Sequence, residues 1–169
     1  MTAIAQPQSF RWIDAPRGEH LAIAPRPRGG DWLDDEILAW KRDGVDVVVS
    51  LLEIAETQEL SLDSEARSCR AAGIAFESFP IADRSVPRSA EMMLELANRI
   101  QSLLASGNGV LIHCRVGIGR SALIAAVVLV RSGIDADEAF ARIARARGTA
   151  VPDTEEQREW VRQFAASRP

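Results

Sequence analysis

The segment that most constrains the fold lies in the second half of the chain, between Val110 and Arg131. Three apolar residues and a histidine precede a loop with two glycines, and nine consecutive apolar residues, 122–130, follow it. A short apolar run that ends at such a loop is typical of a buried strand, and nine apolar residues are too few to cross a bilayer. The segment therefore predicts a buried strand, a tight loop and a buried helix.

The rest of the chain alternates short apolar runs with amphipathic stretches. Periodicity predicts strands over 10–13, 21–24, 45–52, 74–80 and 110–113. It predicts helices over 63–72, 91–105, 121–131, 136–146 and 154–166, and another that begins at Asp31 or Asp34 and ends near Arg42. This alternation indicates an α/β domain, in which a central, mostly parallel sheet of about four to five strands is flanked by helices on both faces.

Length and composition bear on the number of domains and on the class of partner. A chain of 169 residues without an internal repeat is expected to form a single domain, 1–169. Within it, we expect 1–30 to supply short strands and loops and 45–166 to form the core. A content of 47% apolar and 26% charged residues with a net charge of −4 is typical of a soluble globular protein. It gives no indication of a nucleic-acid or membrane partner, and the oligomeric state is not indicated.

The numbers of cysteines and histidines indicate which cellular compartment and which metal sites to expect. The two cysteines are too few for the disulfide framework of a small secreted protein. The first ten residues lack the basic and apolar regions of a signal peptide. We therefore expect a reducing, cytoplasmic setting. Because His20 and His113 are the only histidines, we expect no metal site and no cofactor.

Residues 113–121 read H-C-R-V-G-I-G-R-S and join the predicted strand to the predicted helix. Such a loop directs successive backbone N–H groups and the helix dipole toward one small volume, which favours an anion. The same donors favour the thiolate of Cys114, which is the nucleophilic form. Arg120 supplies a planar fork that can hold two phosphate oxygens, and the Ser121 hydroxyl could donate to the sulfur. The candidate phosphate-binding loop consists of His113, Arg115, Val116, Gly117, Ile118, Gly119 and Arg120.

A simpler interpretation treats Cys114 as a small buried hydrophobic residue before a glycine turn. We favour the chemical interpretation because His, Cys, five intervening residues, Arg and Ser occur together between an apolar strand and an apolar helix. The loop also lacks the Gly-Lys-Ser/Thr of nucleotide-binding loops, so a nucleotide ligand is not indicated.

This constellation resembles the protein tyrosine and dual-specificity phosphatase superfamily, whose signature is H-C-x-x-x-x-x-R-S/T. A second motif, I-A-D-R-S-V-P at 81–87, resembles the mobile acid loop of that family, W-P-D-x-G-V-P. Asp83, Val86 and Pro87 match, whereas Trp, Pro and Gly are replaced. The replacements are similar to those of the smaller dual-specificity members, particularly the cyclin-kinase-associated type. The resemblance covers about 45–164 and implies the fold of that family.

The resemblance also implies a reaction, namely phosphomonoester hydrolysis through a phosphocysteine intermediate without a metal. In it, Cys114 is the nucleophile, Arg120 holds the phosphate, and Ser121 helps the sulfur to leave. Asp83 is the expected proton donor to the leaving group, although a loop aspartate can instead serve only to cap a turn. Arg84 and Arg88 flank it and could attract an anionic substrate, but exposed arginines are usually only solvated.

Several further residues are candidates for supporting roles. Gln157 resembles the late glutamine with which the family positions the hydrolytic water; alternatively, it is a surface glutamine. Asp153 or Thr154 is expected to cap the last helix, with Glu156 or Gln157 completing a capping box. Glu53 or Glu56 could form an ion pair with Arg120. Cys69 is expected to be a buried structural cysteine, although some family members protect the nucleophile through a disulfide, here Cys69–Cys114.

The absence of tyrosine from the sequence bears on the substrate. The larger tyrosine-specific phosphatases carry a tyrosine in the loop that deepens the pocket, so the resemblance implies a shallower pocket that accepts phosphotyrosine and phosphoserine or phosphothreonine in proteins. A phosphoinositide or another non-protein phosphate is the alternative substrate. Two alternatives of another class are a non-catalytic phospho-ligand binding module and a thiol redox sensor.

Overall fold

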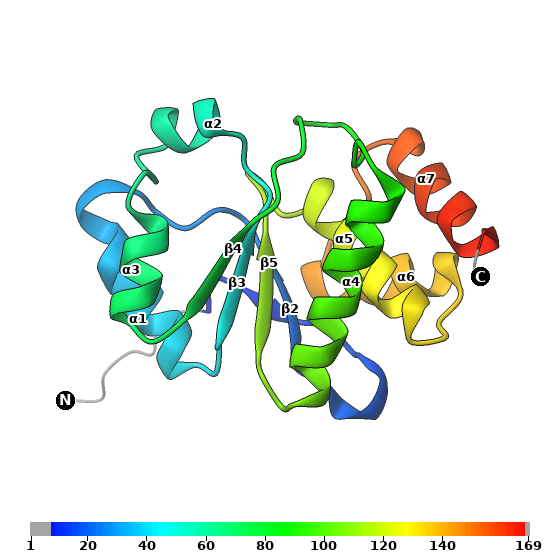
Figure 1. Cartoon of the computed structure of the whole chain (residues 1–169), viewed down its shortest axis with the longest axis horizontal. Helices are drawn as coiled ribbons and strands as arrows, with labels where there is room; N and C mark the ends of the chain where they lie inside the picture. The colour runs from blue at the N-terminus through cyan, green and yellow to red at the C-terminus, as the bar shows by residue number, and fades with distance from the viewer. Residues whose placement is uncertain (1–7, 168–169) are drawn as a thin grey trace.

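A five-stranded sheet forms the middle layer of the computed structural model, which describes residues 8–167 (Figure 1). The strand order is β1-β2-β5-β3-β4; β1 pairs with β2 in antiparallel register, and all the other pairs are parallel. The predicted mostly parallel sheet of an α/β fold is therefore confirmed. The strands are β1 (Arg11–Trp12), β2 (Leu21–Ala24), β3 (Val47–Ser50), β4 (Ala75–Ser78) and β5 (Val110–His113).

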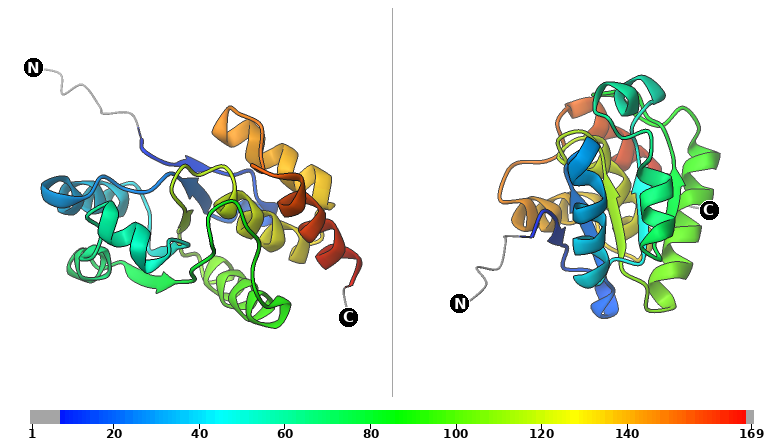
Figure 2. Two further views of the ribbon diagram at one scale, coloured as in Figure 1. Left: turned by 90° about the horizontal axis from the view of Figure 1, so that it is seen from above. Right: turned by 90° about the vertical axis from the view of Figure 1, so that its left-hand side faces the viewer.

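Helices cover both faces of the sheet (Figure 2). Side chains that alternate along each inner strand point to opposite faces and join two separate cores, because the side-chain period of a strand is two. Val110 and Ile112 belong to the core under α4–α7, whereas Leu111 belongs to the core under α1 and α3. The helices are α1 (Leu33–Arg42), α2 (Ile54–Glu59), α3 (Glu65–Ala71), α4 (Ala90–Ala105), α5 (Arg120–Arg131), α6 (Ala136–Arg147) and α7 (Glu155–Ala166).

Helix α5 occupies the centre of the larger core. Every residue from Arg120 to Val130 is buried, and the helix contacts α4, α6, α7 and the sheet. Full burial explains why nine of these residues in succession are apolar, since no side of the helix faces water. Among the described residues, no helix has both the length and the apolar character that crossing a membrane requires.

Two local predictions differ from the structure. Helix α1 starts at Leu33 after a short 3-10 turn, Gly30–Trp32, and neither proposed aspartate caps it. The Asp34 carboxylate instead accepts a hydrogen bond from Ser68 Oγ at 2.5 Å, which ties α1 to α3. Helix α2 was not predicted, because it has only six residues and only Glu56 among them is buried, so it leaves no apolar periodicity in the sequence.

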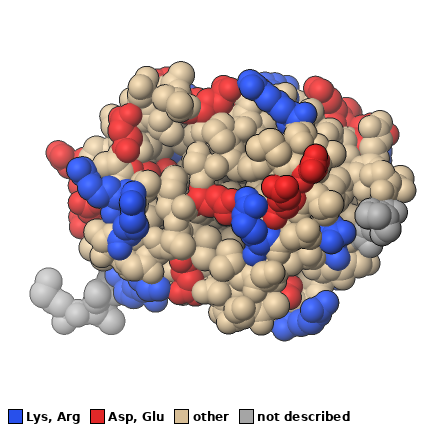
Figure 3. Space-filling view, in the orientation of Figure 1, with Lys and Arg blue, Asp and Glu red and all other residues tan. Residues whose placement is uncertain are grey.

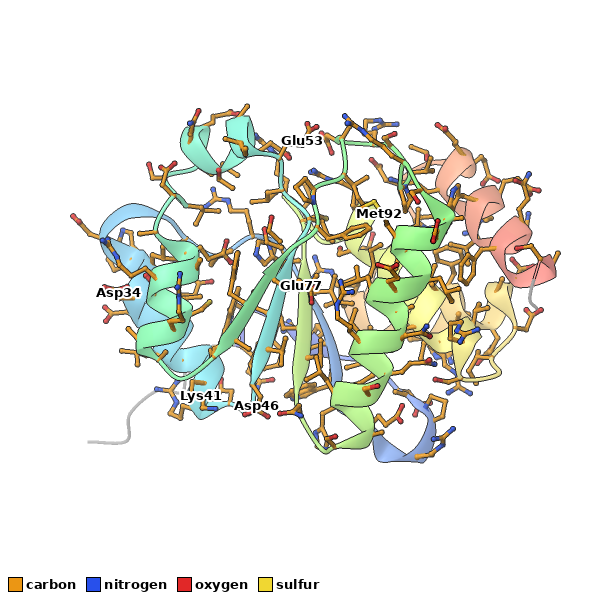
Figure 4. The ribbon with its side chains drawn as sticks, in the orientation of Figure 1. Asp34, Lys41, Asp46, Glu53, Glu77 and Met92 are labelled. Atoms are coloured by element: carbon orange, nitrogen blue, oxygen red, sulfur yellow. The ribbon has the colours of Figure 1, made fainter. Side chains whose placement is uncertain are left out.

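The parallel arrangement brings the loops that follow β3, β4 and β5 to one edge of the sheet, where open α/β sheets bind their ligands. Figure 4 shows Glu53 at this end, beside α2, whereas Lys41 and Asp46 form an ion pair of 2.9 Å at the opposite end. On the face seen in Figure 3, acidic and basic side chains are interspersed without a large patch of one sign. Surface charge therefore does not mark a functional site, whereas the loops at the carboxyl ends of β3, β4 and β5 lie where a ligand site is expected.

Candidate active site

The loop between β5 and α5 curls around the sulfur of Cys114. The Gly117 N–H donates to Cys114 Sγ at 3.3 Å, and the Ser121 hydroxyl lies 3.2 Å from the same sulfur. Ser121 stands in the first turn of α5, so the sulfur also faces the positive end of the helix dipole. The sequence predicted donors around this sulfur, and the structure places the Gly117 N–H and the Ser121 hydroxyl within hydrogen-bond distance of it; the thiolate itself stays a prediction.

Two glycines let this loop pack as closely as it does. Gly117 has a φ of +77°, and a Cβ there would lie 2.6 Å from the carbonyl group of Ala24 at the end of β2. At Gly119, a Cβ would lie 3.0 Å from the Cβ of Asp153. The sequence predicted glycines that allow the backbone to curl; the structure adds that the backbone of β2 closes position 117 to a side chain and that a side chain at position 119 would require Asp153 or Gln157 to shift.

Arg147, at the end of α6, supports the outer side of the loop. Its Nε donates to the Gly117 carbonyl at 2.9 Å, and its Nη2 donates to the Val116 carbonyl at 3.2 Å. Burial lowers the pKa of Arg147, and the positive charge of Arg11 lowers it further. The sequence analysis missed this residue, because it lies 30 positions after the loop within an ordinary amphipathic helix.

Arg120 is buried, with 1% of its side chain exposed, and both of its terminal nitrogens contact Glu56. Its Nη1 donates to Glu56 Oε2 at 2.7 Å, and its Nη2 donates to Oε1 at 2.9 Å. The Ile81 carbonyl accepts a further hydrogen bond from Nη1 at 2.9 Å. Of the two predicted partners, Glu56 is therefore the one that holds Arg120, whereas the Glu53 N–H donates to Glu56 Oε2 at 2.9 Å.

The ion pair between Arg120 and Glu56 determines how both groups titrate. Burial raises the pKa of Glu56, but hydrogen bonds from the Arg120 guanidinium and the Glu53 N–H lower it more, and the net shift is downward. Burial likewise lowers the pKa of Arg120, but the bond to Glu56 and the charges of Cys114 and Asp83 outweigh that effect and raise it. The guanidinium is thus held charged and in a fixed orientation at the site.

Asp83 lies at the mouth of the site on the loop after β4. Its Oδ1 is 3.2 Å from Arg120 Nη2 and also accepts a hydrogen bond from the Arg84 N–H at 3.0 Å. Its side chain is 62% exposed. Asp83 therefore contacts both its neighbour Arg84 and the Arg120 guanidinium, and its role as proton donor stays a prediction.

A cavity of about 250 Å³ lies between these groups. Cys114, which is 3% exposed, and Arg120 both line this cavity, so an anion in the cavity would lie beside both residues. The Arg84 guanidinium crosses its rim to Asp153, at 3.3 Å. The lining residues are Asp83, Arg84, Cys114, Val116, Ile118, Gly119, Arg120 and Asp153.

Two residues of the predicted phosphate-binding loop, His113 and Arg115, are not among those that line this cavity. His113 is fully buried; its Nε2 lies 2.7 Å from Glu65 Oε1 and its Nδ1 lies 3.3 Å from the Cys114 carbonyl oxygen. Arg115 pairs with Glu59 at 2.8 Å and contacts Glu56 at 3.5 Å. Glu65 was missed by the sequence analysis, because nothing in its local sequence marks a partner 48 residues away.

Gln157 is buried rather than on the surface, which corrects that alternative. It completes the predicted capping box of α7 with Thr154: the Gln157 N–H donates to Thr154 Oγ1, and the Thr154 N–H donates to Gln157 Oε1, both at 3.1 Å. Its Nε2 donates to the Ser85 carbonyl at 3.1 Å, which connects α7 to the loop that carries Asp83. Its role in positioning water stays a prediction.

The predicted burial of Cys69 is confirmed, and the two cysteines lie in different cores, so the structure does not contain the alternative Cys69–Cys114 disulfide. Both thiols are free and buried; Cys114 belongs to the core under α4–α7 and Cys69 to the core under α1 and α3. The sheet separates them. Burial, and then the charge of Glu65, raises the pKa of Cys69 to about 12. Across residues 8–167, no three or more His, Cys, Asp and Glu side chains are grouped to hold a metal ion.

Comparisons with known proteins agree with this geometry. A family model described as a polymorphic toxin system DSP-PTPase phosphatase matches residues 24–134, more than half of the chain. Dual specificity protein phosphatase 2 of Mus musculus is 34% identical over 79 residues, which is 46% of this chain and only 25% of that protein. The chain thus matches about a quarter of the length of that relative.

Two solved structures extend the similarity to the whole fold. A mutant form of Tk-PTP is 31% identical with a TM-score of 0.76, and the match covers 94% of this chain and 95% of that one. Kinase associated phosphatase has a TM-score of 0.86, with 98% and 99% of the two chains covered. At 20% identity, the latter is evidence for the fold only.

Proposed function

Since the chain belongs to the DSP-PTPase phosphatase family, we propose that it hydrolyses phosphomonoesters of tyrosine, serine and threonine side chains in proteins. The observation that carries this proposal is that the Cys114 sulfur and the Arg120 guanidinium line one cavity, with Asp83 at its mouth. These groups supply a nucleophile, an anion clamp and a proton donor within one site.

In the first step, the Cys114 thiolate attacks phosphorus. A sulfur–phosphorus bond forms as the bond from phosphorus to the leaving oxygen breaks, and Asp83 gives its proton to that oxygen. The backbone N–H groups of the loop and the guanidinium of Arg120 hold the three equatorial oxygens as charge spreads across them. The bidentate contact between Arg120 and Glu56 supports this role, because it leaves the guanidinium in place before the substrate arrives.

In the second step, water attacks the phosphocysteine. The sulfur–phosphorus bond breaks, inorganic phosphate leaves, and the Asp83 carboxylate takes the proton from the water. The Ser121 hydroxyl, 3.2 Å from the sulfur, is placed to stabilise the departing thiolate. Gln157 contacts the loop that carries Asp83 through its hydrogen bond to the Ser85 carbonyl. We propose that it also positions the attacking water. All these groups come from the protein, and we propose that the reaction is metal-independent.

The charges around the cavity favour a substrate with a single phosphate. Among the described residues of the cavity lining, each arginine is matched by a carboxylate: Arg120 by Glu56, and Arg84 by Asp153. Arg115, the variable basic residue of the loop, pairs with Glu59 instead. A polyphosphorylated inositol would need unpaired cations for its additional phosphates. This pattern supports a protein substrate over a phosphoinositide.

The remaining predictions complete the proposal. We propose that the chain, 1–169, is one phosphatase domain with 45–166 as its catalytic core, and that the segment 1–30 contributes β1 and β2 to the sheet. The protein acts in the cytoplasm, where the reducing potential keeps a nucleophilic thiol from oxidation. The partner is the phosphorylated protein that it dephosphorylates.

Hydrolysis of p-nitrophenyl phosphate in the presence of EDTA tests the reaction, and a panel of phosphopeptides and phosphoinositides tests the substrate. We expect turnover that EDTA does not reduce, together with faster hydrolysis of phosphopeptides. An inactive wild-type protein that still binds phosphopeptides would indicate a binding module. Activity that depends on a metal, or a preference for phosphoinositides, would contradict the corresponding part of the proposal. Reversible inactivation by peroxide without any turnover would favour the redox sensor.

A further inference from the structure

A buried carboxylate contacts the histidine that precedes the nucleophile. Glu65, at the start of α3, is 1% exposed, and His113, at the end of β5, is fully buried. Glu65 Oε1 lies 2.7 Å from His113 Nε2, while His113 Nδ1 lies 3.3 Å from the carbonyl oxygen of Cys114. The imidazole ring thus connects a helix on one face of the sheet to the backbone of the nucleophile.

Both contacts of the ring fix where protons must be. A carbonyl oxygen can only accept a hydrogen bond, so Nδ1 must carry a proton when it contacts Cys114. A second proton must lie between Nε2 and Glu65 Oε1, on either atom. A neutral ring beside a bare carboxylate has only one proton, which the carboxylate would draw to Nε2, leaving two acceptors facing each other at the Cys114 carbonyl.

The surroundings agree with a pair that holds two protons and no net charge. Glu65 Oε2 is buried and has no hydrogen-bond partner, an arrangement that is costly for a fully ionised carboxylate. The ring of Trp40 lies 6.2 Å from the His113 ring, between their centroids, and Cys69 is buried one turn after Glu65 on α3. Water therefore has little access to replace either contact.

We propose that Glu65 is a positioning residue, which keeps the His113 ring oriented and protonated at Nδ1 so that this N–H holds the carbonyl of Cys114. The carbonyl orientation sets the peptide plane between Cys114 and Arg115 and hence the direction of the N–H groups that follow the nucleophile. Glu65 touches neither the cavity nor the substrate, and it acts only through His113. This inference rests on the proposed function, because the positioned atom is the proposed nucleophile.

Glu65→Met and Glu65→Gln separate the contact from the volume of the side chain. Methionine fills the space without any hydrogen bond, whereas the glutamine amide can donate to Nε2 and leave the proton on Nδ1. With p-nitrophenyl phosphate, we expect Glu65→Met to lower kcat by about 10- to 100-fold with a KM changed less than about threefold. We expect Glu65→Gln to restore most of that loss. Cys69→Ala, a change in the same buried part of α3, is the matched control and should leave kcat within about twofold.

NMR of the His113 ring nitrogens shows which nitrogen carries the proton. If Glu65 had only a structural role, replacing it would not change this protonation pattern. The sequence has only two histidines, so a His20→Gln variant assigns the spectrum. We expect Nδ1 to be protonated in the wild type and in Glu65→Gln, and the two tautomers to mix in Glu65→Met. If Glu65→Met does not fold, the spectrum of Glu65→Gln decides, because a proton on Nε2 alone would overturn the inference.

Other outcomes separate the positioning role of Glu65 from the proposed function. A folded Glu65→Met protein with wild-type kcat and an unchanged ring spectrum would overturn the positioning role. The ring spectrum does not depend on turnover, so the two claims can fail separately. An inactive wild type whose Nδ1 is protonated would overturn the proposed function but leave the contact between His113 and Cys114 in place. An active wild type whose Nδ1 is not protonated would overturn this inference alone.

Discussion

Two loops border the cavity, and they are held in different ways. The Cys114 loop, residues 114–119, packs against β2 through Gly117 and accepts hydrogen bonds from Arg147, and Cys114, Gly117 and Gly119 in it are buried. The acid loop, residues 81–88, exposes 62% of the Asp83 side chain and 65% of that of Arg84. It reaches α7 through one hydrogen bond from Gln157, and the segment before α7 through one ion pair with Asp153.

This difference matches what each loop has to do. Reorganising hydrogen-bond donors around an anion costs free energy. An anion site avoids this cost when its donors are already fixed before the substrate arrives. A proton donor must instead let the substrate enter and then approach the leaving oxygen, which requires a loop with few buried contacts. We therefore expect changes in the Cys114 loop to affect chemistry or stability severely, and changes in the acid loop to affect chemistry alone.

The largest effect is expected for Cys114→Ser. A serine hydroxyl is far less ionised than a thiol in the same site, so we expect a loss of kcat of at least about 10⁴-fold. Binding of inorganic phosphate should persist, because the loop N–H groups and Arg120 remain. Steady-state kinetics and phosphate titration measure the two properties, and residual turnover near wild-type level would remove Cys114 from the role of nucleophile.

A parallel alkylation experiment compares the two cysteines. Because the pKa of Cys69 is raised to about 12, it stays a neutral thiol at pH 8, whereas we expect Cys114 to react with iodoacetamide and lose activity. Mass spectrometry of the modified peptide identifies the site. Alkylation of Cys69 before Cys114 in the folded protein would contradict the contrast between their environments.

The next largest effect is expected for Asp83→Asn in the acid loop. Loss of a general acid should lower kcat by about 10²- to 10⁴-fold for phosphoserine peptides, whose alkoxide leaving group needs a proton. The loss should be smaller for p-nitrophenyl phosphate, because p-nitrophenolate leaves more readily. Thermal unfolding should be almost unchanged for this exposed residue. Equal losses for both substrates would indicate that Asp83 does not protonate the leaving group.

Glu56→Gln tests the support behind the Cys114 loop. Removing one partner of a buried ion pair should lower the free energy of unfolding by about 3 kcal/mol at pH 7. The pKa of Glu56 is lowered by folding from its ordinary value of 4.5, so its stabilising contribution is complete above that pH. It is lost as the pH falls through the lowered pKa, so urea unfolding should show the difference between variant and wild type shrinking in acid.

Glu59→Gln is the matched control for that prediction. Glu59 also pairs with an arginine of the loop, Arg115, but its side chain is 65% exposed. We expect a change in the free energy of unfolding of less than about 1 kcal/mol. A loss as large as that of Glu56→Gln would mean that burial is not what distinguishes the two pairs.

The smallest effect is expected for Arg84→Ala, which removes the ion pair between the acid loop and Asp153. An exposed pair of this kind contributes about 0–1 kcal/mol, so unfolding should change little. If the pair retains the acid loop over the cavity, kcat should fall by a few-fold and recover partly at low ionic strength in Arg84→Lys. A wild-type kcat in Arg84→Ala would show that Gln157 and the loop backbone suffice to hold Asp83.

Most of the correct predictions about the site came from residues that are adjacent in the sequence. His113 to Ser121 lie in one stretch, so the order of strand, glycine loop and helix was enough to predict an anion site beside Cys114. The nine apolar residues after it predicted the central helix, and the acid-loop motif pointed to Asp83. These features depend on neighbours within a few positions, for which the sequence itself fixes the geometry.

Partners that come from distant segments depend on which element ends converge, and that is set by tertiary structure. The sequence offered Glu53 and Glu56 as equal partners for Arg120, and only the packing of α2 selects Glu56. Glu65 reaches His113 because β5 ends beside α3, and Arg147 reaches the loop because α6 folds back along α5. Burial of Cys69 was predicted correctly, but the sequence left a Cys69–Cys114 disulfide open as an alternative for the same reason: the sheet that places the two cysteines in different cores is assembled from strands far apart in the chain, and no local pattern encodes that separation.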